Sequence, residues 1–238
     1  MGGVLRRVLV KVSGEALGPR GLVAESITTL AGEIRAAADA GSEIGVVLGG
    51  GNLLRARDLD LPSVRRPVLD RMGMLATVVN ALALAETLQS QGRAAVVLTA
   101  TSMPGVAEPF RMERARELLS AGSVVLLAGG TGHPFFTTDT AAALRALEIG
   151  ADALLKATKV DGVYSADPVA NPDAVRYDSL GYDDVLRMRL SVMDLTAITL
   201  CRENRLPIRV FDMGVPGNLR RVVRGEAVGT LVGGDHVR

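Results

Sequence analysis

The segment VVLLAGGTGHPFFTTDTAAALRALEIG, Val124–Gly150, decides the fold class. Its first five residues are apolar and predict a buried strand, and glycines end this strand at once. Pro134 then bars helix, and the cluster Thr137-Thr138-Asp139-Thr140 offers side-chain caps for an Ala- and Leu-rich helix. Strand, glycine turn and helix N-terminus together point backbone N–H groups at one place. The segment therefore predicts an anion site, with phosphate as the expected anion.

Length and composition indicate a globular α/β enzyme. The 238 residues can bury a full core, as one α/β domain or two closely fused lobes, and we treat 1–238 as a single domain. Hydrophobic content of 48% with 22% charged residues is ordinary for a soluble enzyme. A net charge of +1 creates no global field that would favour nucleic acid or an anionic membrane. The apolar runs have strand length, which predicts no membrane-spanning segment.

The cysteine and histidine content narrows the chemistry. The single cysteine, Cys201, excludes an internal disulfide and suits a reducing cytoplasm. It lies in an apolar run, so a buried inert thiol is favoured over a nucleophile. The histidines are His133 and His236 only, and cysteines do not cluster, so we expect no metal site built by the protein itself.

Lysine is rare in this chain. Of the 27 basic residues only Lys11, Lys156 and Lys159 are lysine, and the others are arginine. A chain with this bias keeps lysine mainly where a compact ammonium is needed and a planar guanidinium does not serve. All three lysines stand at or just after the carboxyl end of a predicted strand, which favours this interpretation over chance.

Two further predicted strands end in glycine turns. Arg7–Val12 is followed by Ser13-Gly14, and Ile44–Leu48 is followed by Gly49-Gly50-Gly51. Such turns present N–H groups at the carboxyl edge of a sheet, the usual ligand side of an open α/β fold. Each signal has a plainer alternative, because Lys11 could simply extend to water and three glycines could form a flexible turn. Arg55 could bind phosphate as a fork, whereas Arg57 is expected to be solvated.

The remaining pattern alternates strands with helices. Further strands are predicted at 94–98, 152–155, 208–211 and 229–232, and helices at 25–40, 70–88, 107–119, 182–189, 194–203 and 219–223, with loops at 17–23 and 60–67. This alternation predicts a mostly parallel sheet covered on both faces. The helix beginning at Asp70 is so apolar that nearly every face must be covered, as a core helix or a subunit contact. Asp70 itself could hold a sugar hydroxyl, although a helix cap is the favoured interpretation.

These features fit transfer of a phosphoryl group between two anions. That reaction needs little covalent help from the protein and much positive charge around the transferring group. Lys11 and Lys156 would neutralise the donor and the transferring group, the glycine turns would hold the oxygens, and Asp139 would orient the lysines or a magnesium ion. No GxxxxGK[ST] motif occurs, which excludes the P-loop kinase architecture.

Several motifs resemble the bacterial uridylate kinases of the amino acid kinase superfamily. The motifs are KVSGEAL from Lys11, VVLGGGNLLR ending at Arg55, DRMGMLATVVNALA from Asp70, GGTGHPFFTTDTAA from Gly129, KATKVDGVYSADP from Lys156, VMDLTA from Val192 and LPIRVFDM from Leu206. The resemblance covers nearly the whole chain. The PFFTTD and DRMGMLAT segments are the ones that point to uridylate. It implies a three-layer αβα sandwich, and transfer of the ATP γ-phosphoryl group to UMP, giving UDP and ADP in pyrimidine nucleotide (CTP/UTP) biosynthesis.

The resemblance also assigns site residues. It implies that UMP binds in the N-terminal part and ATP, with Mg²⁺ held mainly by its phosphates, in the C-terminal part. Catalytic residues would be Lys11, Arg55, Asp139 and Lys156. ATP would contact Lys11, Val12, Ser13, Gly14, Gly51, Arg55, Thr158, Tyr164 and Asp167. UMP would contact Gly50, Asp70, Thr131, Gly132, His133, Pro134, Phe135, Phe136, Thr137 and Thr138.

Some expectations concern regulation and assembly. UTP resembles UMP closely enough to occupy the acceptor site, so feedback inhibition is expected. The loop at 17–23, LGPRGLV, lacks the Gly-Phe-Gly signature of the GTP-activating loop, so the resemblance does not extend to activation by GTP. His133 stands where the family motif has asparagine, and both residues donate a hydrogen bond. The family forms hexamers, and the apolar helix at 72–84 is the expected contact surface.

Two alternatives stay open at this stage. Another amino acid kinase with a carboxylate or carbamate acceptor would share Lys11, Lys156 and the glycine turns, and would differ at Asp70 and in the PFFTT segment. A non-catalytic pyrimidine sensor would bind UMP or UTP and regulate a partner. A sensor need not keep the transfer residues Lys11, Asp139 and Lys156, and all three are present, which favours the kinase.

Overall fold

A nine-stranded sheet forms the centre of the computed structural model, which describes residues 3–55, 61–168, 170–190 and 192–233. The strand order is β4-β3-β5-β2-β1-β6-β10-β11-β9, and all pairs are parallel except β10 with β11. The strands are β1 (Arg7–Val12), β2 (Glu43–Leu48), β3 (Ala95–Thr99), β4 (Glu108–Pro109), β5 (Val124–Ala128), β6 (Ala153–Thr158), β9 (Ser179–Leu180), β10 (Ile208–Asp212) and β11 (Thr230–Val232).

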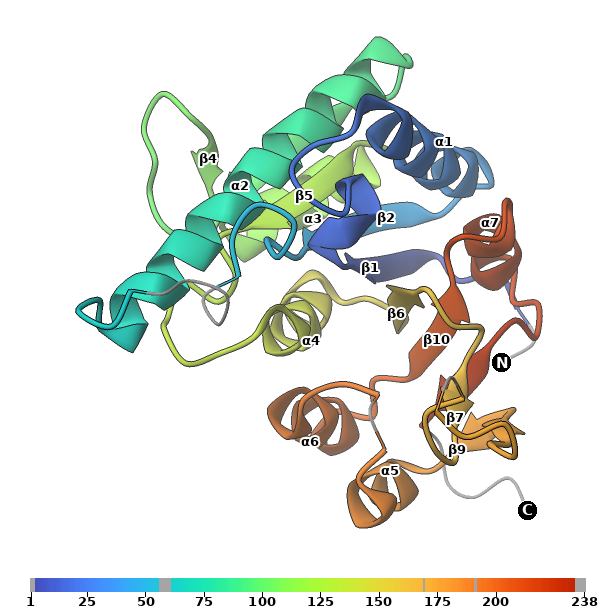
Figure 1. Cartoon of the computed structure of the whole chain (residues 1–238). Coiled ribbons are helices and arrows are strands. Elements are labelled where there is room, and N and C mark those ends of the chain that lie inside the picture. The colour runs from blue at the N-terminus through green and yellow to red at the C-terminus, as the bar shows by residue number, and fades with distance from the viewer. Residues whose placement is uncertain (1–2, 56–60, 169, 191, 234–238) are drawn as a thin grey trace.

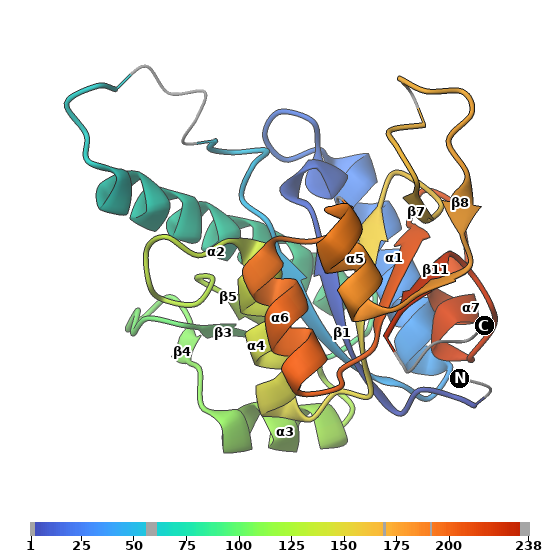
Figure 2. The same ribbon diagram turned by 90° about the horizontal axis from the view of Figure 1, so that it is seen from below.

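Helices cover both faces of this sheet, as a parallel sheet requires. Figure 1 shows α1 and α2 above the strands and α4 and α6 below them. Seen from below, α4, α5 and α6 lie in front of the strands (Figure 2). The helices are η1 (Gly14–Leu17), α1 (Ala24–Asp39), α2 (Arg66–Ser90), α3 (Met112–Ser120), α4 (Thr138–Ile149), α5 (Tyr182–Met188), α6 (Leu195–Glu203) and α7 (Asn218–Val223). The predicted three-layer αβα architecture is therefore confirmed.

The register of the central strands brings the predicted lysines together. β1 lies between β2 and β6, and Lys11 is directly opposite Lys156 in the β1–β6 pair. Successive side chains of a strand point to opposite faces, so the two lysines share one face and their neighbours Val12 and Ala157 share the other. The glycine turns after β1, β2 and β5 all lie at the carboxyl edge, as predicted.

Most predicted elements occur within one or two residues of their expected bounds. β1 and β5 match the predictions residue for residue. The strand predicted to end at Leu155 continues through Lys156 to Thr158, so Lys156 is part of β6. Cys201 is fully buried in α6, and burial raises the pKa of its thiol to about 12, as an inert core thiol requires.

Two predicted helix starts are wrong, and one pair of strands was not predicted. α2 begins at Arg66 and not at 70, because Pro67 fits the first helical turn, where its missing N–H has no intrahelical acceptor. α3 begins at Met112 and not at 107, because the preceding Glu108–Pro109 pairs with β3 as the edge strand β4. A small antiparallel pair, β7 (Val163–Tyr164) with β8 (Arg176–Tyr177), lies within a region predicted as loop.

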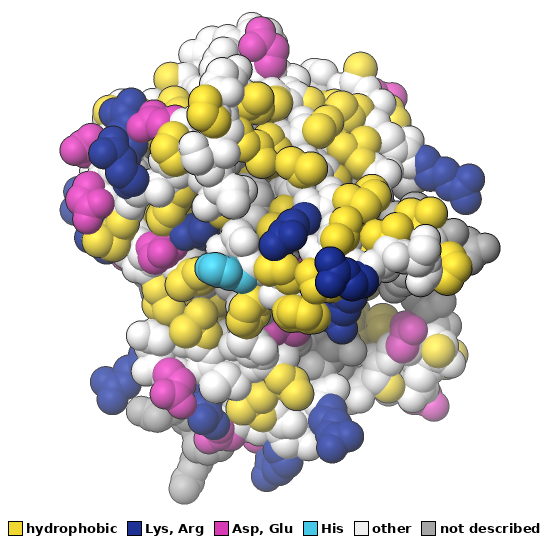
Figure 3. Space-filling view, turned by 90° about the vertical axis from the view of Figure 1, so that its left-hand side faces the viewer, with side chains coloured by type: hydrophobic (Ala, Val, Ile, Leu, Met, Phe, Trp, Pro, Cys, Tyr) yellow, Lys and Arg dark blue, Asp and Glu magenta, His cyan; other side chains and the backbone are white. Residues whose placement is uncertain are grey.

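The helix α2 also departs from the expectation that apolar runs have strand length. Among the described residues it is the one helix whose length and mean hydropathy, 1.5, would suit a membrane span. It packs instead against α1, β3 and β5 as a core helix. Its outer side is not covered by this chain, because Val68, Leu75, Val79 and Leu82 are exposed. Figure 3 shows hydrophobic side chains gathered on the left-hand face of the molecule in Figure 1, toward which α2 extends.

Candidate functional site

A cavity of about 630 Å³ opens at the carboxyl edge of β1, β2 and β5. It brings together predicted residues from four separate segments: Lys11, Ser13, Gly14, Gly50, Gly51, Arg55, Asp70, Thr131, Phe136, Thr137 and Thr138. Glu15, Leu54, Leu69, Gly73, Met74 and Thr77 complete its walls together with Gly49 and Gly130. A cavity of this volume is large enough for a small organic ligand.

Asp139 joins the two opposed lysines, of which Lys11 lines this cavity and Lys156 does not. Lys11 Nζ lies 2.9 Å from Asp139 Oδ1, and Lys156 Nζ lies 2.8 Å from Asp139 Oδ2. All three side chains are at most 16% exposed. The arrangement has one surplus positive charge, because two ammonium groups share one carboxylate. This surplus charge would attract an anion in the cavity strongly, because buried surroundings screen charges weakly.

The ionisation of the three groups reflects this arrangement. Burial alone would raise the pKa of the Asp139 carboxyl, but attraction to Lys11 and Lys156 outweighs it, so the pKa lies below its ordinary value. Burial lowers the pKa of the Lys156 ammonium; attraction to Asp139 opposes this, and repulsion from Lys11 adds to it. The carboxylate therefore stays ionised and keeps both cations in place.

The N-terminus of α4 holds Asp139 in position. Thr137 Oγ1 accepts hydrogen bonds from the Asp139 and Thr140 N–H groups at 3.0 and 3.3 Å, which confirms the predicted capping cluster. Asp194 in turn accepts hydrogen bonds from the hydroxyls of Thr137 and Thr140. Lys156 Nζ also donates to the carbonyl of Val192. The segment before α6 thus fixes both the carboxylate and one of its lysines.

Asp70 lies one turn inside α2, so the favoured prediction that it caps this helix is wrong. Its Oδ2 accepts a hydrogen bond from the Phe135 N–H at 2.8 Å and lies 3.7 Å from Arg66 Nε. Phe135 has a φ of 74°, in the left-handed region that non-glycine residues seldom adopt. Asp70 therefore ties the glycine-rich segment after β5 to α2, at the wall of the cavity.

Arg55 and Lys159 share a second carboxylate, that of Glu15. Arg55 pairs with Glu15 and donates from Nε to the Gly51 carbonyl at 3.0 Å. Lys159 Nζ lies 3.1 Å from Glu15 Oε2. The sequence analysis did not single out Glu15, although its place directly after the Ser13-Gly14 turn was a signal. Arg57 lies outside the described residues.

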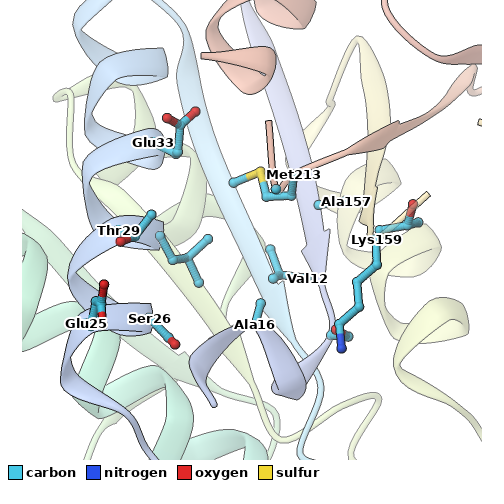
Figure 4. A pocket seen from close by; sticks show the side chains of 13 residues that line it. Val12, Ala16, Glu25, Ser26, Thr29, Glu33, Ala157, Lys159 and Met213 are labelled. Atoms are coloured by element: carbon cyan, nitrogen blue, oxygen red, sulfur yellow. The ribbon is translucent and has the colours of Figure 1, made fainter. Parts of the chain in front are cut away.

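The remaining predicted ATP contacts line two other pockets. Val12, Ser13 and Thr158 line a cavity of about 340 Å³ between α1 and the ends of β1 and β6. Glu25, Ser26, Thr29 and Glu33 follow one side of this cavity along α1, and Lys159 extends on the other side (Figure 4). Tyr164 and Asp167 line a separate pocket of about 370 Å³, with Met188 and Leu190. The predicted ATP set is thus divided, and only its phosphate-side members share the main cavity.

The segment from Thr131 to Phe136 is largely on the surface. His133, Phe135 and Phe136 are exposed, and Gly132 and Pro134 are partly exposed. Thr131 Oγ1 accepts a hydrogen bond from the His133 N–H at 3.1 Å. Phe136 faces the cavity, whereas His133 does not line it. The sequence predicted this segment but not the residues that hold its two ends, Thr77 at Gly129 and Asp194 at Thr137, because both come from elements distant in the chain.

Comparison with known proteins gives a consistent family assignment. The model of the amino acid kinase family matches residues 6–212. The chain is 53% identical to the uridylate kinase of Legionella pneumophila (strain Lens) over 234 residues, which cover 97% of this chain and 95% of that one. It is 52% identical to the uridylate kinase of Vibrio cholerae over 230 residues, 95% of each chain. The crystal structure of UMP kinase from Bacillus anthracis superposes with a TM-score of 0.95 at 38% identity, covering 98% of both chains.

The shared carboxylate predicts a pH-dependent loss of stability. The folded-state pKa of Asp139 lies below the ordinary value of 3.8, so its ionised form stabilises the fold above pH 3.8, and this contribution is lost as pH falls through the folded-state pKa. Asp139→Asn should lower the free energy of unfolding at neutral pH by about 3 kcal/mol, the scale for breaking a buried ion pair. The difference from the unsubstituted chain should shrink towards acidic pH.

Urea unfolding of both proteins at neutral pH and near pH 3 measures this effect. Asp39→Asn is the matched control, because Asp39 pairs with Arg93 at 3.2 Å on the surface. We expect that control to change the free energy of unfolding by less than about 1 kcal/mol. An equal destabilisation by Asp139→Asn at both pH values would contradict the assigned electrostatic role.

Proposed function

The chain belongs to the amino acid kinase family, and on that premise we propose that it is a uridylate kinase, which transfers the γ-phosphoryl group of ATP to UMP and releases UDP and ADP. The observation that carries the proposal is the Lys11–Asp139–Lys156 trio beneath the cavity between the glycine turns. The reaction belongs to pyrimidine nucleotide biosynthesis, and the buried single thiol suits a cytoplasmic enzyme.

The lysines stabilise the charge of the transferring group. An oxygen of the UMP phosphate attacks the γ-phosphorus as the bond to the β-phosphate oxygen breaks, and negative charge spreads over the equatorial oxygens. Lys11 and Lys156 face these oxygens from two adjacent strands. Asp139 keeps both ammonium groups oriented and charged before substrate arrives. Arg55, released from Glu15, is the fourth catalytic group and pairs with the donor phosphates.

Both nucleotides bind around the same cavity. Backbone N–H groups of Ser13, Gly14 and Gly51 hold the ATP phosphates, next to Val12. Gly50, Asp70 and the segment 131–138 hold UMP on the N-terminal side, with His133 at its edge. Thr158, Tyr164 and Asp167 hold the adenosine half on the C-terminal side. The lining of the main cavity by Ser13, Gly14, Gly50, Gly51 and Asp70 supports the first two assignments. The pocket beside Tyr164 supports the placement at Tyr164 and Asp167, whereas Thr158 lines the separate cavity beside α1.

Magnesium accompanies ATP as its phosphate complex. Within the described ranges, no three acidic, histidine or cysteine side chains converge as a metal site. Asp139 and Glu15 are each already paired with two cations. These residues fit an ion held mainly by phosphate oxygens, which reduces the negative charge that the lysines must neutralise. The protein's own contribution is the surplus positive charge on the opposite side of the phosphates.

Two rival functions are less well supported. A carboxylate or carbamate kinase is not favoured, because identity of about half to uridylate kinases extends over nearly the whole chain. A pure pyrimidine sensor has no need of Lys11, Asp139 and Lys156 in contact. Feedback inhibition by UTP at the acceptor site is part of the proposal.

We further propose assembly into a homohexamer through the exposed apolar side of α2. Exposed Leu75, Val79 and Leu82 on one helix face form a surface that association would remove from water. Light scattering should give a mass of about six chains of 24.9 kDa, and Leu75→Glu with Val79→Glu should reduce that mass. A monomeric unsubstituted chain would reject this part of the proposal.

Steady-state assays test the function directly. We expect ADP release from ATP with UMP as acceptor, and much slower release with N-acetylglutamate or carbamate, and CMP and dUMP in the same assay measure selectivity among pyrimidine nucleotides. UTP should inhibit competitively with UMP. Release of ADP with N-acetylglutamate or carbamate but not with UMP would overturn the proposed substrate.

Removal of one lysine separates binding from catalysis. Lys156→Ala should bind both nucleotides and lose turnover by roughly 10²-fold or more, the scale for removing one charge-stabilising group. Isothermal titration measures binding, and initial rates give kcat. Arg93→Ala, which removes a surface cation, is the control and should keep full turnover. Undiminished turnover in Lys156→Ala would refute its assigned role.

A further inference from the structure

The buried side of α2 carries an amide that contacts the glycine turn after β2. Asn80 is fully buried, and its Nδ2 donates to the Gly49 carbonyl at 2.8 Å and to Asn52 Oδ1 at 2.7 Å. Asn52 Nδ2 donates back to Asn80 Oδ1 at 3.1 Å. Because Asn80 Nδ2 faces a main-chain carbonyl, the reverse orientation of this amide would bring two oxygens together. The two amides therefore form a directional pair.

The pair also reaches the loop that follows η1. Asn52 Nδ2 donates to the main-chain carbonyl of Gly21 at 2.8 Å. The main-chain carbonyl of Asn52 accepts from the Gly21 N–H, also at 2.8 Å. Both hydrogens of each amide group are thus used on specific partners. Asn80 anchors the turn at 49–52, and through that turn it also anchors the loop at 17–23.

The turn held by Asn80 lies against the turn after β1. A Cβ atom on Gly14 would lie 2.7 Å from the Gly49 carbonyl oxygen and 3.0 Å from the Gly51 nitrogen. Real Cβ atoms essentially never approach backbone so closely, so a shift of one turn displaces the other. On its other side the turn is just as tight, since a Cβ on Gly50 would lie 2.8 Å from the Gly73 carbonyl of α2. The turn at 49–52 is therefore packed closely on both sides, and its position depends on the hydrogen bonds of Asn80.

Packing alone does not require an amide at position 80. A buried polar group costs free energy unless it is fully hydrogen-bonded, and of its buried neighbours on α2 only Thr77 is polar, whereas Ala76, Ala81 and Leu84 are apolar. An apolar side chain would fill the same space without that requirement. The amide is accounted for by what it holds, which is the main chain of the turn at 49–52 directly and that of the loop at 17–23 through Asn52.

We propose that Asn80, acting through Asn52, is a positioning residue that sets the relative placement of the donor and acceptor phosphates. The inference rests on the proposed kinase function, in which Gly14 and Gly51 hold ATP and Gly50 holds UMP. In-line transfer depends on the distance between the attacking oxygen and the γ-phosphorus, and misplacement by about 1 Å can cost 10²-fold in rate. Asn80 touches neither nucleotide in this arrangement, so its loss affects turnover more than binding.

The test compares Asn80→Ala with Thr87→Ala, measuring kcat and the dissociation constants of ATP and UMP for each. Thr87 is a matched control, because its hydroxyl bonds within the same helix to the Ala83 carbonyl at 2.8 Å, away from the cavity. We expect Asn80→Ala to lower kcat by about 10- to 100-fold while both dissociation constants change by less than about threefold. Thr87→Ala should leave all three quantities unchanged.

A double-substitution cycle adds a readout that a purely structural role would not produce. If the amides act as a pair, Asn52→Ala should lower kcat as much as Asn80→Ala, and the double variant should lose no more than either single variant. Asn52→Ala also serves if Asn80→Ala fails to fold. Additive losses, or unchanged kcat in folded variants, would overturn the inference. An unsubstituted chain without activity on ATP and UMP would instead reject the kinase function.

Discussion

Two like charges held side by side inside the protein are the constraint on which the site depends. Lys11 and Lys156 are opposite each other in paired strands, so the register of the sheet itself brings two ammonium groups together. Burial penalises both, and only a carboxylate between them makes the pair tolerable. Asp139 supplies it from the first turn of α4. The cap at Thr137 and the anchor at Asp194 are consequences of that need, because the carboxylate must not move.

The same strand register explains why the two faces of the sheet carry different kinds of side chain at its carboxyl edge. The face that carries the lysines faces α4, and the opposite face at the same strand positions carries Val12 and Ala157, which line the smaller cavity beside α1. Strand alternation thus places the buried lysines and the small apolar side chains on opposite faces of a single sheet. Ser13 lines both cavities, so the two adjoin at the carboxyl edge of the sheet.

The sequence predicted the structure around the cavity correctly where the signal was local. Strand, glycine turn and helix cap occur within consecutive residues, so Val124–Gly150 and the turn after Val12 were assigned correctly. Partners that depend on tertiary contact were not found: Asp70 was interpreted as a cap because its bond to Phe135 joins residues 65 positions apart. The start of α2 was missed for a different reason, since Pro67 is equally compatible with a loop and with a first helical turn. Asp194 and the Asn52–Asn80 pair gave no periodic or compositional signal, and Glu15 was not predicted although it directly follows the Ser13-Gly14 turn.

The helix α2 imposes its own geometry on the site. Asp70 bonds to Phe135, Thr77 Oγ1 accepts from the Gly129 N–H at 2.8 Å, and Asn80 bonds to Gly49, all from the inner side of one continuous helix. Ten residues of helix span about 15 Å at a fixed rise per residue. The distance between the loops after β2 and β5 is therefore determined by a length that backbone hydrogen bonds of the helix set. As a rigid unit, α2 moves its three contacts together, so only bending within the helix would change the spacing between the two loops.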